Sequence, residues 1–176
     1  MSRHARADAM PSPAKPDGLE PLRRMPPNDL NAVLERARSL QLQAQADALQ
    51  ALLRGRKLGL LCETDESADA ALFRRAAVEL GAYVAHIRPN LSEVSSVQEV
   101  QRTARILGRL YDAVECQGLA STLVEQLGHE AGVPFFDAIA SPRHPSARLA
   151  RRLGGHVPAA DRRRIVLQAV LLSVIV

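Results

Sequence analysis

Hydrophobic and polar positions alternate with two different periods along most of this chain. Four short apolar runs, each closed by polar residues, have the form of buried strands, and apolar residues between them recur at helical spacing. The predicted strands are residues 57–63, 83–87, 112–116 and 133–136. A first helix is predicted to begin at Pro27, and three further helices are predicted at residues 68–80, 97–110 and 120–130. This alternation implies right-handed crossovers between parallel strands. We therefore predict an α/β fold, with a four-stranded parallel sheet and helices on both of its faces.

The last apolar run, residues 165–176, differs from the others in having almost no polar side chains. Its 12 residues include one Gln and one Ser as the only polar ones, and they are too few for a membrane span, which needs about 20. Such a segment must be buried in a groove of its own domain or against another subunit. We expect residues 160–176 to form a closing helix on a domain of residues 26–155, although the β-branched residues keep a strand open as an alternative.

Residues 1–25 have a different composition from the rest of the chain. Four prolines lie among Ala, Ser and charged residues with few large apolar side chains, so the segment cannot offset the entropy of ordering. Its acids and prolines also argue against an amphipathic targeting helix, and it lacks the continuous apolar core of a signal peptide. We predict a disordered tail and a cytoplasmic protein.

Composition and charge indicate the number of domains, the kind of core and the character of one surface. A length of 176 residues favours one domain, and 47% hydrophobic with 3% aromatic residues indicates an aliphatic core. The net charge of +4 comes largely from the tail and from an arginine group that could bind nucleic acid or an acidic partner. No aromatic or glycine-rich recognition pattern accompanies that group. We therefore favour a solvated basic face, made of Arg143, Arg148, Arg151, Arg152, Arg162, Arg163 and Arg164.

The two cysteines, Cys62 and Cys116, each lie within an apolar run that we interpret as a strand. Their positions support neither metal-ligand spacing nor a disulfide framework. We expect two buried thiols in a reducing compartment, with no metal and no cofactor.

Candidate functional residues should lie at one edge of the predicted sheet. In parallel sheets, ligands bind beyond the carboxyl ends of the strands. The loops to inspect are therefore those that follow Glu63, Ile87, Cys116 and Phe136.

Segments around these loops match one protein family in order and spacing. Residues 53–63 read Leu-Arg-Gly-Arg-Lys-Leu-Gly-Leu-Leu-Cys-Glu, a glycine turn that leads into a strand ending in glutamate. Residues 103–107 read Thr-Ala-Arg-Ile-Leu, and residues 133–138 read Val-Pro-Phe-Phe-Asp-Ala ahead of His144-Pro145. Together, over about residues 27–155, they resemble the N-terminal carbamoyl-phosphate-binding domain of the aspartate/ornithine carbamoyltransferases, with most similarity to the ornithine type.

The closing segment resembles the same family less specifically. Residues 161–172 begin Asp-Arg-Arg-Arg and look like the family's final helix, which begins Glu-Asn-Arg and packs back on the first domain. The resemblance implies that the middle of a carbamoyltransferase, including the second domain that brings the amino-acid substrate, is missing here and that the closing helix is retained.

The resemblance also implies that the carbamoyl-phosphate pocket is degenerate. The family holds the phosphate with a Ser-x-Arg-Thr-Arg segment at the start of a helix, which aligns with residues 66–70, Glu-Ser-Ala-Asp-Ala, so both arginines are replaced. A third family arginine falls at Gln117, and the Gln of a His-Pro-x-Gln motif falls at Ala147, which leaves His144 as the survivor. The degenerate pocket then comprises Glu66, Ser67, Asp69, Gln117, His144 and Ala147.

Our hypothesis depends on how much free energy of phosphate binding is lost with these arginines. A hydrogen bond to a charged group contributes roughly 1.5–3 kcal/mol, so three missing arginines remove on the order of 4–9 kcal/mol of phosphate binding. Glu63, Asp65, Glu66 and Asp69 add repulsion, although first-turn acids also favour the helix dipole. We interpret His144 as a helix-start residue, or as one that supports a neighbouring contact residue, rather than as a direct ligand contact, and Thr103 and Arg105 as architectural.

We therefore expect a non-catalytic carbamoyltransferase-like protein, without catalytic residues, that serves in assembly, regulation or ligand binding. One alternative is an active carbamoyltransferase, of the ornithine type in amino-acid metabolism, with an altered or partner-completed site. Another is nucleic-acid binding through the basic C-terminal third, which we consider unlikely. Family resemblance implies a homotrimer or a hetero-oligomer with a true carbamoyltransferase, and no association with a membrane.

Overall fold

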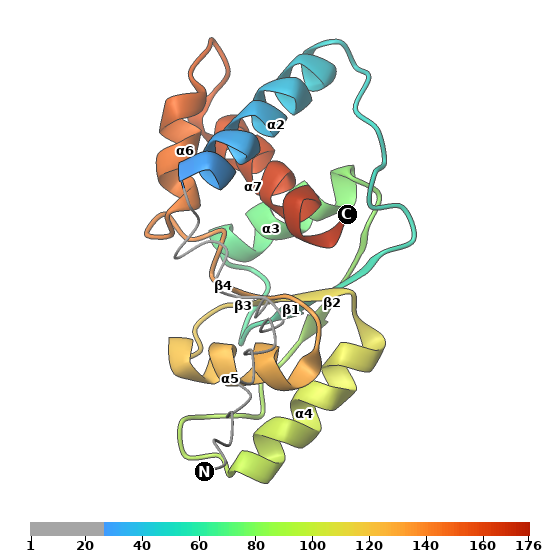
Figure 1. Cartoon of the computed structure of the whole chain (residues 1–176), viewed down its shortest axis with the longest axis vertical. Helices are drawn as coiled ribbons and strands as arrows, with labels where there is room; N and C mark the ends of the chain where they lie inside the picture. Colours follow the sequence, from blue (N-terminus) through green and yellow to red (C-terminus); the bar gives the residue numbers. More distant parts are fainter. Residues whose placement is uncertain (1–26) are drawn as a thin grey trace, which may run out of the picture.

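Strands and helices alternate along residues 27–176, which the computed structural model describes (Figure 1). The predicted tail, residues 1–25, lies outside the described residues. Every predicted strand and helix is present, with bounds that differ by at most two residues. The strands are β1 (Lys57–Leu61), β2 (Tyr83–Ile87), β3 (Ala113–Cys116) and β4 (Phe135–Asp137). The helices are α2 (Pro27–Gln45), α3 (Ala68–Glu79), α4 (Val97–Leu110), α5 (Ser121–Ala131), α6 (Ser146–Leu153) and α7 (Ala159–Ile175).

The four strands form one parallel sheet in the order β2-β1-β3-β4. In its centre, Leu58 of β1 is level with Val84 of β2 on one side and with Ala113 of β3 on the other. Nearly every residue of β1 and all of β3 are buried, as expected for strands covered on both faces. The prediction of an α/β fold with a four-stranded parallel sheet is confirmed.

Helices α2, α3, α6 and α7 cover one face of the sheet, in the upper part of Figure 1. The residues from Ile165 to Leu172 of α7 are all buried, and α7 contacts α2, α3 and α6. The amide of Gln168 is buried and donates to Ala76 O at 3.3 Å and to Glu79 Oε2 at 3.0 Å. The alternative of a closing strand is thereby excluded, because the segment is a helix packed on the domain.

Helices α4 and α5 cover the opposite face and build a separate cluster with Leu61, Val114 and Phe135 of the sheet. A capping box begins α4, in which Ser96 Oγ accepts from Glu99 N and the Glu99 carboxylate accepts from Ser96 N. The two helices touch so closely that a Cβ on Gly108 would lie 2.3 Å from Ala131 O.

Helix α6 was indicated in advance only by the interpretation of His144 as a helix-start residue, and its bounds were not predicted. It has only eight residues, and the buried Leu149, Ala150 and Leu153 alternate with exposed arginines. We interpreted those arginines as a basic surface without assigning them a secondary structure. Within residues 27–176, no helix has the length and apolar character needed to cross a bilayer.

Candidate functional site

The loop after β1 is held by the hydroxyl groups of its own residues. Thr64 Oγ1 accepts a hydrogen bond from Glu66 N at 3.2 Å. Ser67 is the N-cap of α3, and its Oγ accepts from Ala70 N at 3.0 Å. One backbone donor at the start of α3, where the family resemblance places the phosphate, is therefore already paired with a side chain of the chain itself.

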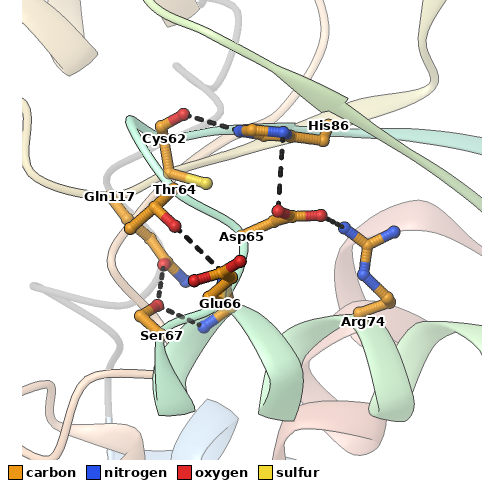
Figure 2. A network of polar contacts seen from close by, with 9 residues as sticks. Cys62, Thr64, Asp65, Glu66, Ser67, Arg74, His86 and Gln117 are labelled. Carbon is orange, nitrogen blue, oxygen red and sulfur yellow. Dashed lines mark hydrogen bonds and ion pairs between the residues drawn. The ribbon is translucent and has the colours of Figure 1, made fainter.

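Asp65, in the same loop, forms an ion pair with Arg74 and lies near the ring of His86 (Figure 2). Its Oδ2 accepts from Arg74 of α3 at 2.8 Å, and its Oδ1 lies 3.8 Å from His86 Nδ1 of β2. The other ring nitrogen of His86 bonds to Cys62 O at 2.8 Å, and since a carbonyl can only accept, that nitrogen carries a proton. The guanidinium of Arg74 and the ring of His86 thus face a loop carboxylate.

Gln117, in the loop after β3, lies beside Ser67 at the start of α3 (Figure 2). Ser67 Oγ donates to Gln117 Oε1 at 3.5 Å, a long hydrogen bond, and Gln117 Nε2 donates to Glu115 Oε1 at 3.3 Å. The residue that replaces a family arginine therefore links the start of α3 to a carboxyl group of β3. This link uses polar groups that could otherwise face a ligand.

Glu115 is a carboxyl group in the interior of the sheet. It is fully buried, and its Oε2 accepts from Ile139 N at 3.3 Å. Desolvation by burial raises the pKa of Glu115 to about 8, against the lowering effect of hydrogen bonds from Gln117 and from the backbone of Ile139 and Ala140. Glu115 is thus mainly protonated at neutral pH, so the floor of this region carries little charge.

The loop after β4 begins helix α6. His144 Nδ1 accepts from Ser146 N at 3.2 Å and lies 3.0 Å from Ser146 Oγ, which in turn donates to Ile139 O at 2.8 Å. In the same loop region, Ser121 Oγ donates to Asp137 Oδ2 at 2.7 Å. These contacts support the interpretation of His144 as a helix-start residue.

The predicted pocket residues fall into two groups. Ser67 and Gln117 are in direct contact, and Glu66 and Asp69 lie on either side of Ser67 at the start of α3. His144 and Ala147 lie at the start of α6, where Ala147 N donates to His144 O at 3.0 Å. The two groups are connected indirectly, through a series of hydrogen bonds that runs Ser67, Gln117, Glu115, Ile139, Ser146 and His144.

Three residues of this network, Arg74, His86 and Glu115, were not found by sequence reasoning. The lone glutamate in the apolar run Ala-Val-Glu-Cys, residues 113–116, was the available signal, because a charge within a buried strand must be paired or neutralised. Neither Arg74 nor His86 carried a comparable signal, since their contacts depend on the packing of α3 and β2.

Both cysteines are free and buried, as predicted. Desolvation raises the pKa of Cys62, with a smaller contribution from Asp65, and burial raises the pKa of Cys116 well above its usual value. Raised pKa values keep both thiols protonated at neutral pH, so neither is an activated nucleophile.

Two arginines are placed differently from our predictions. Arg163 donates to Ala140 O, and Arg164 Nε lies 2.9 Å from Glu79 Oε2, so these two belong to internal contacts rather than to a solvated face. Arg105, which we interpret as architectural, lies on the exposed side of α4.

The chain is similar to known carbamoyltransferases over most of its length. Residues 20–153 match the family "Aspartate/ornithine carbamoyltransferase, carbamoyl-P binding domain". The ornithine carbamoyltransferase of Haemophilus influenzae strain PittGG is 33% identical over 122 residues, which are 69% of this chain and 36% of that protein. The chain therefore spans about a third of the length of such curated relatives.

Solved structures have the same fold. The ornithine carbamoyltransferase of Pyrococcus furiosus aligns with a TM-score of 0.61 at 22% identity, over 72% of this chain and 40% of that one. The enzyme of Thermus thermophilus aligns with a TM-score of 0.60 at 24% identity, over 74% and 45% of the two chains. Since the family match covers most of the sequence, the chain belongs to the aspartate/ornithine carbamoyltransferase family and corresponds to its carbamoyl-phosphate-binding domain.

Proposed function

We propose that this chain is a non-catalytic member of the carbamoyltransferase family whose carbamoyl-phosphate pocket is degenerate. The observation that carries the proposal is the ion pair between Asp65 and Arg74 at the start of α3. The guanidinium of Arg74 is the cation that faces this loop, and it is already engaged by a carboxylate. A phosphate dianion would have to compete with Asp65 for it.

The charges around this pair also oppose phosphate binding. Glu63 and Glu66 are exposed carboxylates of the same loop, and Asp69 lies in the first turn of α3. A negative charge about 4 Å from a phosphate is repulsive by roughly 1 kcal/mol even in water, and by more where solvent is partly excluded. The helix dipole of α3 is worth at most a similar amount to an anion. The loop therefore suits solvent and internal pairing better than a phosphate.

A protein that keeps this fold without the pocket can act through assembly, regulation or the binding of another ligand. By analogy with the family, we propose a homotrimer or a hetero-oligomer with a true carbamoyltransferase as the assembled form. In the second case the chain would modulate its partner rather than catalyse a reaction. A cytoplasmic location and a link to amino-acid metabolism follow from the same analogy.

The proposal is tested by carbamoyl phosphate itself. Because a ligand that binds only the folded state raises the melting temperature once its concentration exceeds the dissociation constant, we expect no shift in differential scanning fluorimetry at millimolar carbamoyl phosphate. We also expect no citrulline from ornithine and no carbamoyl-aspartate from aspartate. The ornithine carbamoyltransferase of Haemophilus influenzae, assayed in parallel, provides the positive control.

Two results would contradict the proposal. A saturable rise in melting temperature with carbamoyl phosphate would mean that the loop still binds phosphate. Product formed by the mixture of this chain and a true carbamoyltransferase, beyond the amount that the latter forms alone, would favour a partner-completed active site.

A further inference from the structure

Helix α4 presents a row of positive charge on the side that faces away from the sheet. Its buried side consists of Val100, Ala104 and Leu107. Arg102, Arg105 and Arg109 follow one another at intervals of three and four residues on the exposed side, so they form one stripe about 10 Å long. We call these three residues the cationic stripe.

Among residues 27–176, the three guanidinium groups of the stripe form no ion pair within 4 Å, although Arg102 is near enough to Glu99 to help lower the pKa of that carboxyl. Ion pairs with Asp or Glu are formed instead by Arg38, Arg56, Arg74, Arg75 and Arg164. The stripe therefore lies on the exposed side of α4 without a close acidic partner.

Beside the stripe, helices α4 and α5 enclose a groove of about 480 Å³. Its apolar part consists of Val97, which is 71% exposed, and Val100 beneath it. Its walls carry the carboxylates of Glu125 and Glu130, of which Glu130 accepts from Gln101 Nε2 at 3.2 Å. We call this feature the acidic groove. It places an exposed aliphatic side chain next to two carboxylates.

The stripe and the groove are complementary and lie on the same layer. The stripe carries three cations, and the groove carries the carboxylates of Glu125 and Glu130, about 7.5 Å apart along the axis of α5, beside His129. A two-fold contact that brings the stripe of each molecule to the groove of the other would be closed and self-complementary. Exposed Ile106 and Leu110 flank the stripe on α4 and would be covered at the same time.

We propose that the layer of α4 and α5 is a dimer contact in which Arg102, Arg105 and Arg109 of one copy lie in the acidic groove of a second copy. A nucleic acid is a poorer occupant, because Glu125 and Glu130 would lie near its phosphates. The inference does not depend on whether the degenerate pocket binds a ligand.

Charge-reversal variants test the contact by analytical ultracentrifugation of the whole chain. We expect the wild type to form a concentration-dependent dimer that weakens between 50 mM and 500 mM NaCl, as screening requires. The stripe variant R102E/R105E/R109E and the groove variant E125R/E130R should each dissociate at least tenfold more readily. Mixing the two variants should restore association, because each supplies the charge that the other has lost.

Two controls keep the test specific. The variant R148E/R151E/R152E makes the same charge change on exposed positions of α6 and should leave the dissociation constant unchanged within about twofold. If the triple stripe variant does not fold, the single variant R105E, at an exposed position, is used and should weaken association severalfold. If the wild type forms a larger assembly, stripe reversal should halve its mass.

The proposal is overturned if the wild type is monomeric at 200 µM, if stripe reversal leaves the mass of the assembly unchanged, or if the mixed variants fail to associate. A monomer that binds duplex DNA in a gel-shift assay through the stripe would also overturn it, in favour of a polyanion as the partner.

Discussion

The two helical layers of this domain differ in how far their helices are covered by other elements. On one face of the sheet, α7 is enclosed by α2, α3 and α6, and eight consecutive residues from Ile165 to Leu172 are buried. On the other face, α4 and α5 have no layer above them within the described residues, and Val97, Ile106 and Leu110 of α4 are more than half exposed. Helix α7 is thus enclosed by the other helices of its layer, whereas no helix among the described residues covers α4 and α5. Leu42 of α2 and Val78 of α3 show that the α7 layer also has exposed apolar side chains on its outer surface.

Because of this difference, we expect the α7 layer to determine mainly the stability of the fold and the α4 layer to determine mainly association. Burial of a large aliphatic side chain contributes roughly 1.5–3 kcal/mol, so we expect the largest losses of stability from changes in the α7 layer. Changes in the α4 layer should cost less stability, because each of its helices has one buried side only. The experiments below test this ranking, from the largest expected effect to the smallest.

Removal of residues 165–176 should have the largest effect. The truncation exposes the aliphatic side chains of the α7 layer, and several of them together amount to a large share of a domain stability of about 5–15 kcal/mol. We expect insoluble or unfolded protein, checked by circular dichroism and size-exclusion chromatography. Removal of Val174–Val176 alone, which are only partly buried or exposed, is the matched control and should leave a folded protein. A soluble chain with an unchanged melting temperature after the long truncation would mean that α7 does not complete the core.

Glu115→Gln should change how stability depends on pH. The folded-state pKa of Glu115 is raised to about 8. The contribution of this group to stability is therefore fully present below its unfolded pKa and is lost as pH rises towards 8, at roughly 1.4 kcal/mol per pH unit. The variant is neutral in both states and lacks this loss. Chemical denaturation at intervals between pH 5.5 and 8 should therefore give a steeper decline for the wild type.

A control for this prediction is Glu93→Gln, at an exposed position in the loop after β2, which should leave the pH dependence of the wild type nearly intact. Equal pH slopes for the wild type and for Glu115→Gln would contradict the prediction. They would mean that Glu115 is solvated or paired in a way that keeps it ionised.

Gly108→Ala should weaken the contact between α4 and α5. The added Cβ would lie 2.3 Å from Ala131 O, so one helix must shift. We expect a loss of about 1–3 kcal/mol in the free energy of unfolding, measured by urea denaturation. Gln98→Ala, at an exposed position of the same helix, is the control and should change stability little. If Gly108→Ala instead stabilised the protein, as the higher helix propensity of alanine would favour, the close approach of the two helices would be disproved.

Ser96→Ala should have the smallest effect of the four. It removes the hydroxyl of the capping box that begins α4, which costs about 1 kcal/mol. Ser96→Thr keeps a capping hydroxyl and should retain most of the stability in the same denaturation assay. A loss as large as that of the long truncation would contradict the ranking of the two layers.

Most of the fold could be predicted because its signals are local. Short apolar runs bounded by polar residues located all four strands, and the apolar stripe from Val97 to Leu107 located α4. The bounds of helix α6 were not predicted, because the segment has only eight residues and its three arginines were interpreted as part of a basic surface. The state of the closing segment could not be decided in advance, because an all-apolar run lacks the periodicity that separates helix from strand.

The candidate site was predictable only where family motifs placed residues. They brought Ser67 and Gln117 to the same region, where the two side chains are in contact. The partners Arg74 and His86 could not be foreseen, because Asp65 meets them through the packing of α3 and β2 rather than through sequence proximity. Arginines 163 and 164 were misplaced for the same reason, since their acceptors Ala140 and Glu79 lie far away in the chain.

The pairing of α2 with α7 has a consequence for the order of events during synthesis. Residues 46–158 separate these two helices, which nevertheless pack against each other. Contacts of such long sequence separation form late and slow the acquisition of the native state. At about 5–20 residues per second, the ribosome needs several seconds to translate the intervening segment. During that interval the sheet face under α7 is exposed, and nascent chains depend on chaperones or on low local concentration to avoid aggregation.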